Sequence, residues 1–383
     1  MALTVERELP SEEAHELLAL ARELADAELT PKASLYESEK RFPRETFRTL
    51  GKSGLLGLAY PEEHGGGGQP YAVYLQVLEE LAAAWLSVGI GVSVHTLACH
   101  PLALYGSDEQ RDRWLPELLG GELLGAYCLS EPQSGSDAAA LQTRAVLDGE
   151  DYVVTGTKAW ITHGGVADFY ALMTRTSDDG PRGITCLLAD ASTAGLTSAA
   201  PERKMAANSS QTAQILLDGA RIPVERRLGA EGQGFEIALA ALDSGRLGIA
   251  ACAVGLAQTA LDTAVAYAKE RRQFGRPIAD FQGMQFLLAD AATSINAARE
   301  LYLAAARRKD RGQAFGSQAA MAKLFATDMA MQVTTDCVQV LGGYGYVEDF
   351  PVERYMREAK VLQIVEGTNQ IQRMVIGRAL TRD

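Results

Sequence analysis

The sequence predicts a mainly α-helical protein with a central β-domain, because its hydrophobic pattern changes twice along the chain. Apolar residues recur at helical spacing up to residue 119, short apolar runs between turn formers fill 121–225, and helical spacing then returns. A chain of 383 residues can form a large core and two or three structural units. We therefore expect an N-terminal helical domain (1–120), a middle β-domain (121–225) and a C-terminal helical domain (226–383).

The N-terminal domain is predicted to consist of amphipathic helices. The first spans about 11–30, with Ser11 as its N-cap, and is expected to end before Pro31. Further helices are expected at about 44–53, 71–85, 89–105 and 108–119. The glycine-rich loop at 61–68 fits neither G-x-G-x-x-G nor G-x-x-x-x-G-K-[ST], so we interpret it as a connector.

The middle domain has the pattern of a small antiparallel barrel or sandwich. A hairpin is predicted from 143–147 and 152–156, which flank the turn at 148–151. Further short strands are expected at 169–174, 183–189, 196–199 and 214–217.

The C-terminal domain is predicted to be a four-helix bundle with short additional helices. Helices are expected at about 235–269, 283–311, 317–341 and 352–362. The first of these is apolar or small on nearly every side around 247–256, which is typical of a buried helix. Glycine and proline within 271–278 are expected to interrupt the helical structure.

Composition argues against several classes of protein. The formal net charge of −13 disfavours a surface for nucleic acid or anionic membrane. Five scattered cysteines are typical of free thiols in a reducing compartment, and His95, Cys99 and His100 lack the spacing of a metal site. We expect no apolar run to reach the length that spans a membrane, and the first eight residues lack the pattern of a signal peptide, so we expect a cytoplasmic protein without a metal.

A carboxylate followed by glycine stands between two predicted helices near the C-terminus. Glu366 precedes Gly367, and Thr368 is suited to cap the following helix. Glycine at this position allows a ligand to approach the backbone closely. A solvated acidic residue near a helix N-terminus explains the same pattern, so the interpretation of Glu366 depends on the rest of the chain.

Four other segments are candidates for ligand binding. Residues 127–137 end a strand with hydroxyls and a turn, and residues 158–165 place a tryptophan before a hydroxyl and two glycines. Residues 271–278 form a cationic loop suited to a pyrophosphate, and residues 339–345 contain a glycine turn at a helix end. Turn structure alone explains each segment equally well.

Taken together and in order, these segments resemble the acyl-CoA dehydrogenase family, in particular its short- and branched-chain members. The matching motifs are Leu-Ser-Glu-Pro-x-x-Gly-Ser-Asp, Lys-x-Trp-Ile-Thr, Asp-Ser-Gly-Arg, Arg-x-x-Phe-Gly-x-Pro-Ile, Gln-x-x-Gly-Gly and Glu-Gly-Thr-x-Gln-Ile. The resemblance covers nearly the whole chain and implies the three domains expected above. It also implies FAD bound without a Rossmann motif, a homotetramer, and an electron-transferring flavoprotein as electron acceptor.

The resemblance implies a role for each matched residue. Glu366 is implied as the catalytic base, and the substrate contacts are Ser136, Asp243, Arg246 and Gly367. The residues implied to contact the flavin ring are Tyr127, Leu129, Ser130, Ser136, Trp160, Ile161 and Thr162. Those implied for the adenine half are Arg271, Phe274 and Gln282 of a neighbouring subunit and the turn of Gln339, Leu341, Gly342 and Gly343. Further implied cofactor contacts are Thr368 and Gln370.

The implied reaction is the FAD-dependent α,β-dehydrogenation of a saturated short, medium or branched acyl-CoA to the trans-2-enoyl-CoA, as in fatty acid β-oxidation and lipid metabolism. Glu366 takes the α proton, the β hydrogen leaves as hydride to flavin N5, and the thioester carbonyl is polarised by the backbone N–H of the glutamate and a flavin ribityl hydroxyl. Burial is expected to raise the pKa of Glu366.

Some relatives carry the base at the position of Gly245, which leaves Glu366 as the candidate here. The alternatives are a flavin-dependent oxidase or monooxygenase on the same fold and a non-enzymatic scaffold. The chain departs from the family pattern at His64, at His163 and at 206–210, which puts details of the cofactor contacts in doubt.

Overall fold

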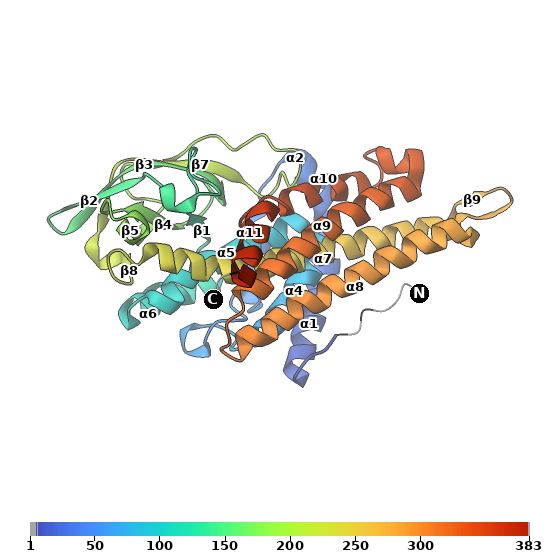
Figure 1. Ribbon diagram of the computed structural model, residues 1–383, viewed down its shortest axis with the longest axis horizontal. Helices are drawn as coiled ribbons and strands as arrows, with labels where there is room; N and C mark the ends of the chain where they lie inside the picture. Colours follow the sequence, from blue (N-terminus) through green and yellow to red (C-terminus); the bar gives the residue numbers. More distant parts are fainter. Residues whose placement is uncertain (1–4, 6, 382–383) are drawn as a thin grey trace.

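The computed structural model describes residue 5 and residues 7–381. The sequence-based expectation about a signal peptide concerns residues that lie mostly outside this range. Figure 1 shows a β-domain at one end of an elongated molecule and long helices that run to the other end. The fold class predicted from the sequence, helical domains on both sides of a central β-domain, is therefore confirmed.

The N-terminal part is helical. Its elements are α1 (Glu12–Leu24), the π-helical η1 (Ala25–Leu29), α2 (Thr30–Glu39), α3 (Arg44–Lys52), α4 (Tyr71–Ala84), α5 (Leu86–Tyr105) and α6 (Asp108–Leu119). Ser11 caps α1 as predicted, because its Oγ accepts the Ala14 N–H at 3.1 Å. The predicted helix end before Pro31 is wrong, since Pro31 lies in the first turn of α2, where the missing N–H leaves no hydrogen bond unmade.

The β-domain is one sheet of eight strands. They are β1 (Gly125–Cys128), β2 (Arg144–Asp148), β3 (Asp151–Thr162), β4 (Phe169–Arg175), β5 (Ile184–Asp190), β6 (Leu196–Ser198), β7 (Thr212–Pro223) and β8 (Arg227–Leu228). The order is β6-β7-β3-β2-β4-β5-β8, and β1 pairs with β4. Most pairs are antiparallel as expected, but β1 and β2 each run parallel to β4. Alternate residues of β4 face α5–α7 or the interior of the β-domain, which joins the sheet to the helices.

The C-terminal part is built around one long central helix. Its elements are α7 (Gly234–Glu270), the hairpin β9 (Arg272–Gln273) and β10 (Arg276–Pro277), α8 (Gln282–Asp310), α9 (Gly316–Leu341), α10 (Val352–Leu362) and α11 (Asn369–Thr381). Helix α7 packs against α4, α5, α8 and α9, and its residues 244–257 are buried as predicted. The expected interruption at 271–278 is the β9–β10 hairpin, which projects from the end of the molecule away from the β-domain (Figure 1).

Two helices among the described residues, α5 and α7, are long and apolar enough to cross a membrane by length and composition alone. The sequence-based expectation that no segment reaches this length is therefore wrong. Their most apolar windows are 94% and 78% buried inside the structure, which is the environment of core helices.

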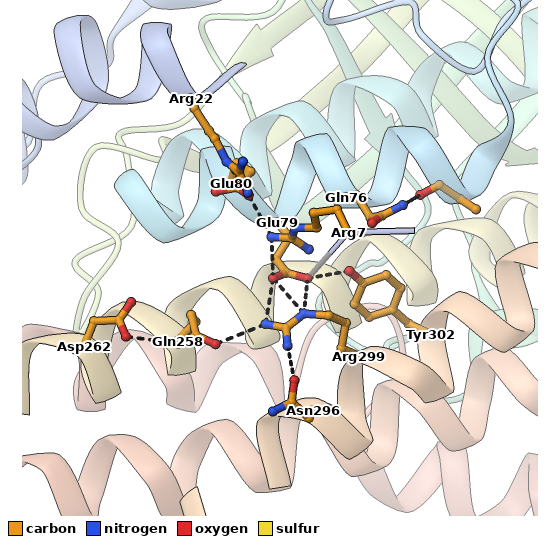
Figure 2. A network of polar contacts seen from close by, with 11 residues as sticks. Arg7, Arg22, Gln76, Glu79, Glu80, Gln258, Asp262, Asn296, Arg299 and Tyr302 are labelled. Carbon is orange, nitrogen blue, oxygen red and sulfur yellow. Dashed lines mark hydrogen bonds and ion pairs between the residues drawn. The ribbon is translucent and has the colours of Figure 1, made fainter. Parts of the chain in front are cut away.

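A buried ion cluster joins the N-terminal segment to the helices. Figure 2 shows the Glu79 carboxylate of α4 between two guanidinium groups, with Arg7 and Arg299 each 2.9 Å from its Oε1. The Tyr302 hydroxyl donates to the other carboxylate oxygen. Because Arg7 and Arg299 outweigh the effect of burial, the pKa of Glu79 lies below its ordinary value. Glu79 is thus an ionised residue that joins the N-terminal segment, α4 and α8.

Candidate active site

Glu366 lies in a strained turn between α10 and α11. Glu366 and Gly367 have φ angles of +53° and +89°, in the left-handed region that favours glycine. A Cβ on Gly367 would lie 2.8 Å from Gln372 Nε2. Thr368 caps α11 as predicted, with its Oγ1 accepting the Ile371 N–H at 3.4 Å. The turn therefore needs glycine at 367 and imposes an uncommon conformation on the glutamate.

Two side chains hold the carbonyl oxygens of this turn. Gln372 Nε2 donates to Glu366 O at 3.2 Å and to Gly367 O at 2.8 Å. Lys323 Nζ, from α9, donates to Gly367 O at 3.0 Å and to Asn369 Oδ1 at 2.9 Å. The sequence analysis missed both residues. Gln372 follows the Glu-Gly-Thr motif on the next helical turn, whereas no sequence signal connects Lys323 with Glu366.

The Glu366 carboxylate is buried and unpaired. Both of its oxygens are shielded from solvent and accept no hydrogen bond from any residue that the structure describes. Burial raises the pKa of this carboxyl to about 7, although the positive charges of Lys323 and Arg246 oppose the shift. The direction of this shift agrees with the expectation from the sequence. A carboxyl with this pKa is partly ionised near neutral pH and has a free lone pair.

Helix α7 leaves room for the carboxylate. A Cβ on Gly245 would lie 2.1 Å from Glu366 Oε2, so a larger residue at 245 would displace the glutamate. Arg246 is 5% exposed and donates from Nη1 to Asp243 Oδ1 at 2.5 Å. The structure thus brings together four residues matched in the sequence, Asp243 and Arg246 on one helix and Glu366 and Gly367 in the turn.

The end of β1 approaches the same place. Tyr127 is buried, and its hydroxyl donates to Ala238 O of α7 at 3.3 Å. Burial raises the pKa of Tyr127, and the Glu366 charge adds to this shift, which places the ring near the carboxylate. Leu129 is buried, Ser130 is half-buried, and Ser136 is exposed in the following turn.

A buried ion pair connects β1 with β3. Lys158 Nζ lies 2.7 Å from Glu131 Oε1, and Ala159 N–H donates to Ser130 O at 2.9 Å. A bulge between Lys158 and Ile161 follows, with Trp160 at a φ of +62°. The bulge turns the indole outward, so Trp160 is 65% exposed while Ile161 is buried in the sheet. A ligand can therefore contact the indole of Trp160 but only the backbone of Ile161.

Two histidines hold the first residue of β1. Gly125 N–H donates to His95 Nδ1 at 3.0 Å, and His163 Nδ1 lies 2.9 Å from Gly125 O. His95 Nε2 lies 2.9 Å from Leu118 O, so both of its ring nitrogens contact the backbone. His163, where the family pattern commonly has asparagine, thus connects the end of β3 with the start of β1. Residues 206–210 also depart from the family pattern, and there the Asn208 N–H donates to Glu37 Oε2 at 2.6 Å.

The residues matched to the adenine half lie around the β9–β10 hairpin, the start of α8 and the C-terminal end of α9, away from the β-domain. Arg271, Leu341, Gly342 and Gly343 line a cavity of about 680 Å³ together with the rings of Tyr267, Tyr344 and Phe350. Gln339 is exposed in the preceding turn of α9, Gln282 is exposed at the start of α8, and Phe274 is 94% exposed at the hairpin tip. Thr368 and Gln370 lie beside Glu366 at the start of α11 and do not line this cavity. A guanidinium, aromatic rings and two glycines with open space at their Cβ positions suit a pyrophosphate and a purine.

Comparisons with known proteins agree with this arrangement. The sequence models of the acyl-CoA dehydrogenase N-terminal, middle and C-terminal domains match residues 11–122, 126–220 and 232–381. An acyl-CoA dehydrogenase of Bacillus subtilis (strain 168) is 44% identical over 363 residues, which cover 94% of this chain and 96% of that protein.

Two solved structures have nearly the same fold. Butyryl-CoA dehydrogenase from Megasphaera elsdenii has a TM-score of 0.96 and 40% identity, covering 99% of this chain and 100% of that one. A chain in a structure described as the electron transferring flavoprotein of Acidaminococcus fermentans has a TM-score of 0.97 and 42% identity, with the same coverage.

The three domain matches and the acyl-CoA dehydrogenases among the relatives define an oxidoreductase that acts on CH–CH bonds, and FAD is its cofactor. The chain belongs to the acyl-CoA dehydrogenase family. The exposed indole of Trp160 suits the flavin end of FAD, and the cavity beside Arg271 suits its adenine end. Within one chain, however, these two sites lie in different parts of the molecule, one in the β-domain and the other beside the β9–β10 hairpin.

Proposed function

We propose that this acyl-CoA dehydrogenase converts a short or branched saturated acyl-CoA to the trans-2-enoyl-CoA, with Glu366 as the base that takes the α proton. The observation that carries the proposal is the buried, unpaired carboxylate of Glu366 with a pKa of about 7. General bases are most effective when their pKa lies near the working pH. The name of the butyryl-CoA dehydrogenase relative supports a short acyl chain.

Residues of this chain prepare the proton transfer. The Glu366–Gly367 turn directs the carboxylate toward Gly245, and the Glu366 N–H, which donates to no backbone oxygen of the described residues, is available to the thioester carbonyl. Polarisation of that carbonyl acidifies the α carbon, and Glu366 accepts the proton. Bound FAD supplies the acceptor for the β hydride. Arg246, held by Asp243, places a positive charge beside the site.

The distance between the two parts of the cofactor site supports assembly of more than one copy of the chain, for which we propose a homotetramer. Tyr127 contacts Ala238 near one end of α7, and Arg271 follows its other end. At a rise of 1.5 Å per residue these points lie roughly 50 Å apart, farther than one FAD extends. The Arg271 end must therefore serve a cofactor whose flavin lies on another copy. The electron-transferring flavoprotein named for a neighbour is the proposed electron acceptor.

The test is Glu366→Gln, which keeps the shape of the side chain and removes the base. We expect the variant to bind FAD and to lose on the order of 10³–10⁴-fold in the rate of anaerobic flavin bleaching by butyryl-CoA. Bleaching at the wild-type rate would overturn the role of Glu366. Rapid reoxidation of the reduced wild-type enzyme by air would favour the oxidase alternative. A screen of acyl-CoA lengths and branches defines the substrate.

A further inference from the structure

We propose that Lys323 is a positioning residue of this site, whose buried ammonium holds the Glu366–Gly367 turn and places a positive charge next to the residue that carries the carboxylate. The inference rests on the proposed function of Glu366. It extends that function to a residue that takes no part in the chemical steps and acts through Glu366. Lys323 lies on α9 and is 0% exposed. Burial of a charged group costs free energy unless hydrogen bonds and opposite charges compensate it.

The contacts of Lys323 all belong to the base and its helix. Nζ donates to Gly367 O, directly after Glu366, and to Asn369 Oδ1, the first residue of α11. Asn369 Nδ2 in turn donates to Asp328 Oδ1 at 2.6 Å and to Thr327 Oγ1 at 2.9 Å, both on α9. The lysine thus fixes the Gly367 carbonyl, which Gln372 also holds.

The charge of Lys323 also acts on the carboxylate. Of the two cations that lower the pKa of Glu366 against the effect of burial, Lys323 is the stronger and Arg246 the weaker. Burial lowers the pKa of Lys323 itself to about 8, so the ammonium persists at neutral pH. The ionisable neighbours that interact with Glu366 from the surrounding elements are Arg246 and Cys252 on α7, Lys323 on α9, Tyr71 and Tyr74 on α4, and Tyr127 on β1.

Three variants separate charge from shape. Lys323→Gln keeps a donor for Gly367 O and removes the charge, Lys323→Arg keeps the charge, and Lys204→Gln is the matched control. Lys204 also donates to a backbone carbonyl, that of Ser210, but its charged neighbour is Glu37. The readouts are the pH profile of anaerobic flavin reduction and an infrared titration of the protonated carboxyl band that Glu366→Gln abolishes.

We expect Lys323→Gln to move both titrations upward by about one pH unit or more, the effect of losing a nearby opposite charge. At pH 7 an upward shift of about one unit lowers the ionised fraction from about one half to about one tenth, a roughly fivefold slower reduction. Lys323→Arg and Lys204→Gln should keep the wild-type midpoint. A uniform loss of rate with an unmoved midpoint in Lys323→Gln would overturn the inference and leave the role of Glu366 intact. Full activity of Glu366→Gln would instead overturn the proposed function.

Discussion

Glu79 and Glu366 both have carboxylates shielded from solvent in the same group of helices, yet the surroundings of the two carboxylates are opposite. Two guanidinium groups and a phenol hydroxyl pair with Glu79, and its pKa is lowered. Neither carboxylate oxygen of Glu366 is paired among the described residues, and its pKa is raised. Glu79 therefore stabilises the fold in its charged form, whereas Glu366 stays reactive because the fold leaves its charge only partly compensated. Four expectations follow from this difference.

The largest effect on stability is expected at the paired carboxylate. Glu79→Gln leaves Arg299 buried without its anion and leaves Arg7 with Glu80 alone, so the free energy of unfolding should fall by about 3–5 kcal/mol. The lowered pKa means that this stabilisation is present at neutral pH and is lost as the pH falls toward the folded-state pKa. Denaturant unfolding measures it. Glu45→Gln, at the exposed pair with Arg48, is the control and should change stability by less than about 1 kcal/mol.

The unpaired carboxylate should respond with the opposite sign. The pKa of Glu366 is raised from 4.5 to about 7 in the folded state. The contribution of Glu366 to the free energy of unfolding is therefore greatest below pH 4.5 and is lost as the pH rises through about 7. Glu366→Gln cannot ionise and should be more stable than wild type by up to roughly 3 kcal/mol at pH 8, with no gain at pH 4. Equal unfolding curves at both pH values would contradict the contrast with Glu79.

Gly367→Ala tests the turn that presents the base. A side chain at a φ of +89°, close to Gln372 Nε2, should lower the free energy of unfolding by about 1–3 kcal/mol and slow flavin reduction. Gly377→Ala, in the helix α11 that follows this turn and with open space at its Cβ position, should be neutral or stabilising. A loss of stability at 377 as large as that at 367 would show that the helix, rather than the turn, is sensitive.

The smallest effect is the pH dependence of the wild-type enzyme. Below pH 7 the ionised fraction of Glu366 falls, so kcat/KM should decrease by about tenfold for each further pH unit. Stopped-flow flavin bleaching between pH 5.5 and 8.5 measures it. A flat profile would mean that the base titrates outside this range.

The sequence was sufficient for the fold class and for two helix caps, whereas the roles of the motif residues stay predictions. Helical spacing and the caps Ser11 and Thr368 are local features, and the structure confirms them. The helix through Pro31 could not be predicted, because a proline in a first turn resembles one that ends a helix. The roles of Lys323 and Glu79 could not be predicted either. Their partners are distant in sequence, and the sequence alone does not distinguish a charged residue that is buried from one that is exposed.

The two imidazoles that bracket Gly125 have a consequence for how the protein tolerates acid. Burial lowers the pKa of His95 to about 4 and that of His163 to about 3, so both rings stay neutral over the whole range in which Glu366 gains and loses its proton. His95 can accept the Gly125 N–H only in this neutral form. The hydrogen bonds that hold the start of β1, the strand that leads to Tyr127 and Ser130, therefore stay unchanged while Glu366 titrates. Mild acidification should therefore inactivate the enzyme reversibly by protonating Glu366, at a pH well above that at which His95 and His163 become charged.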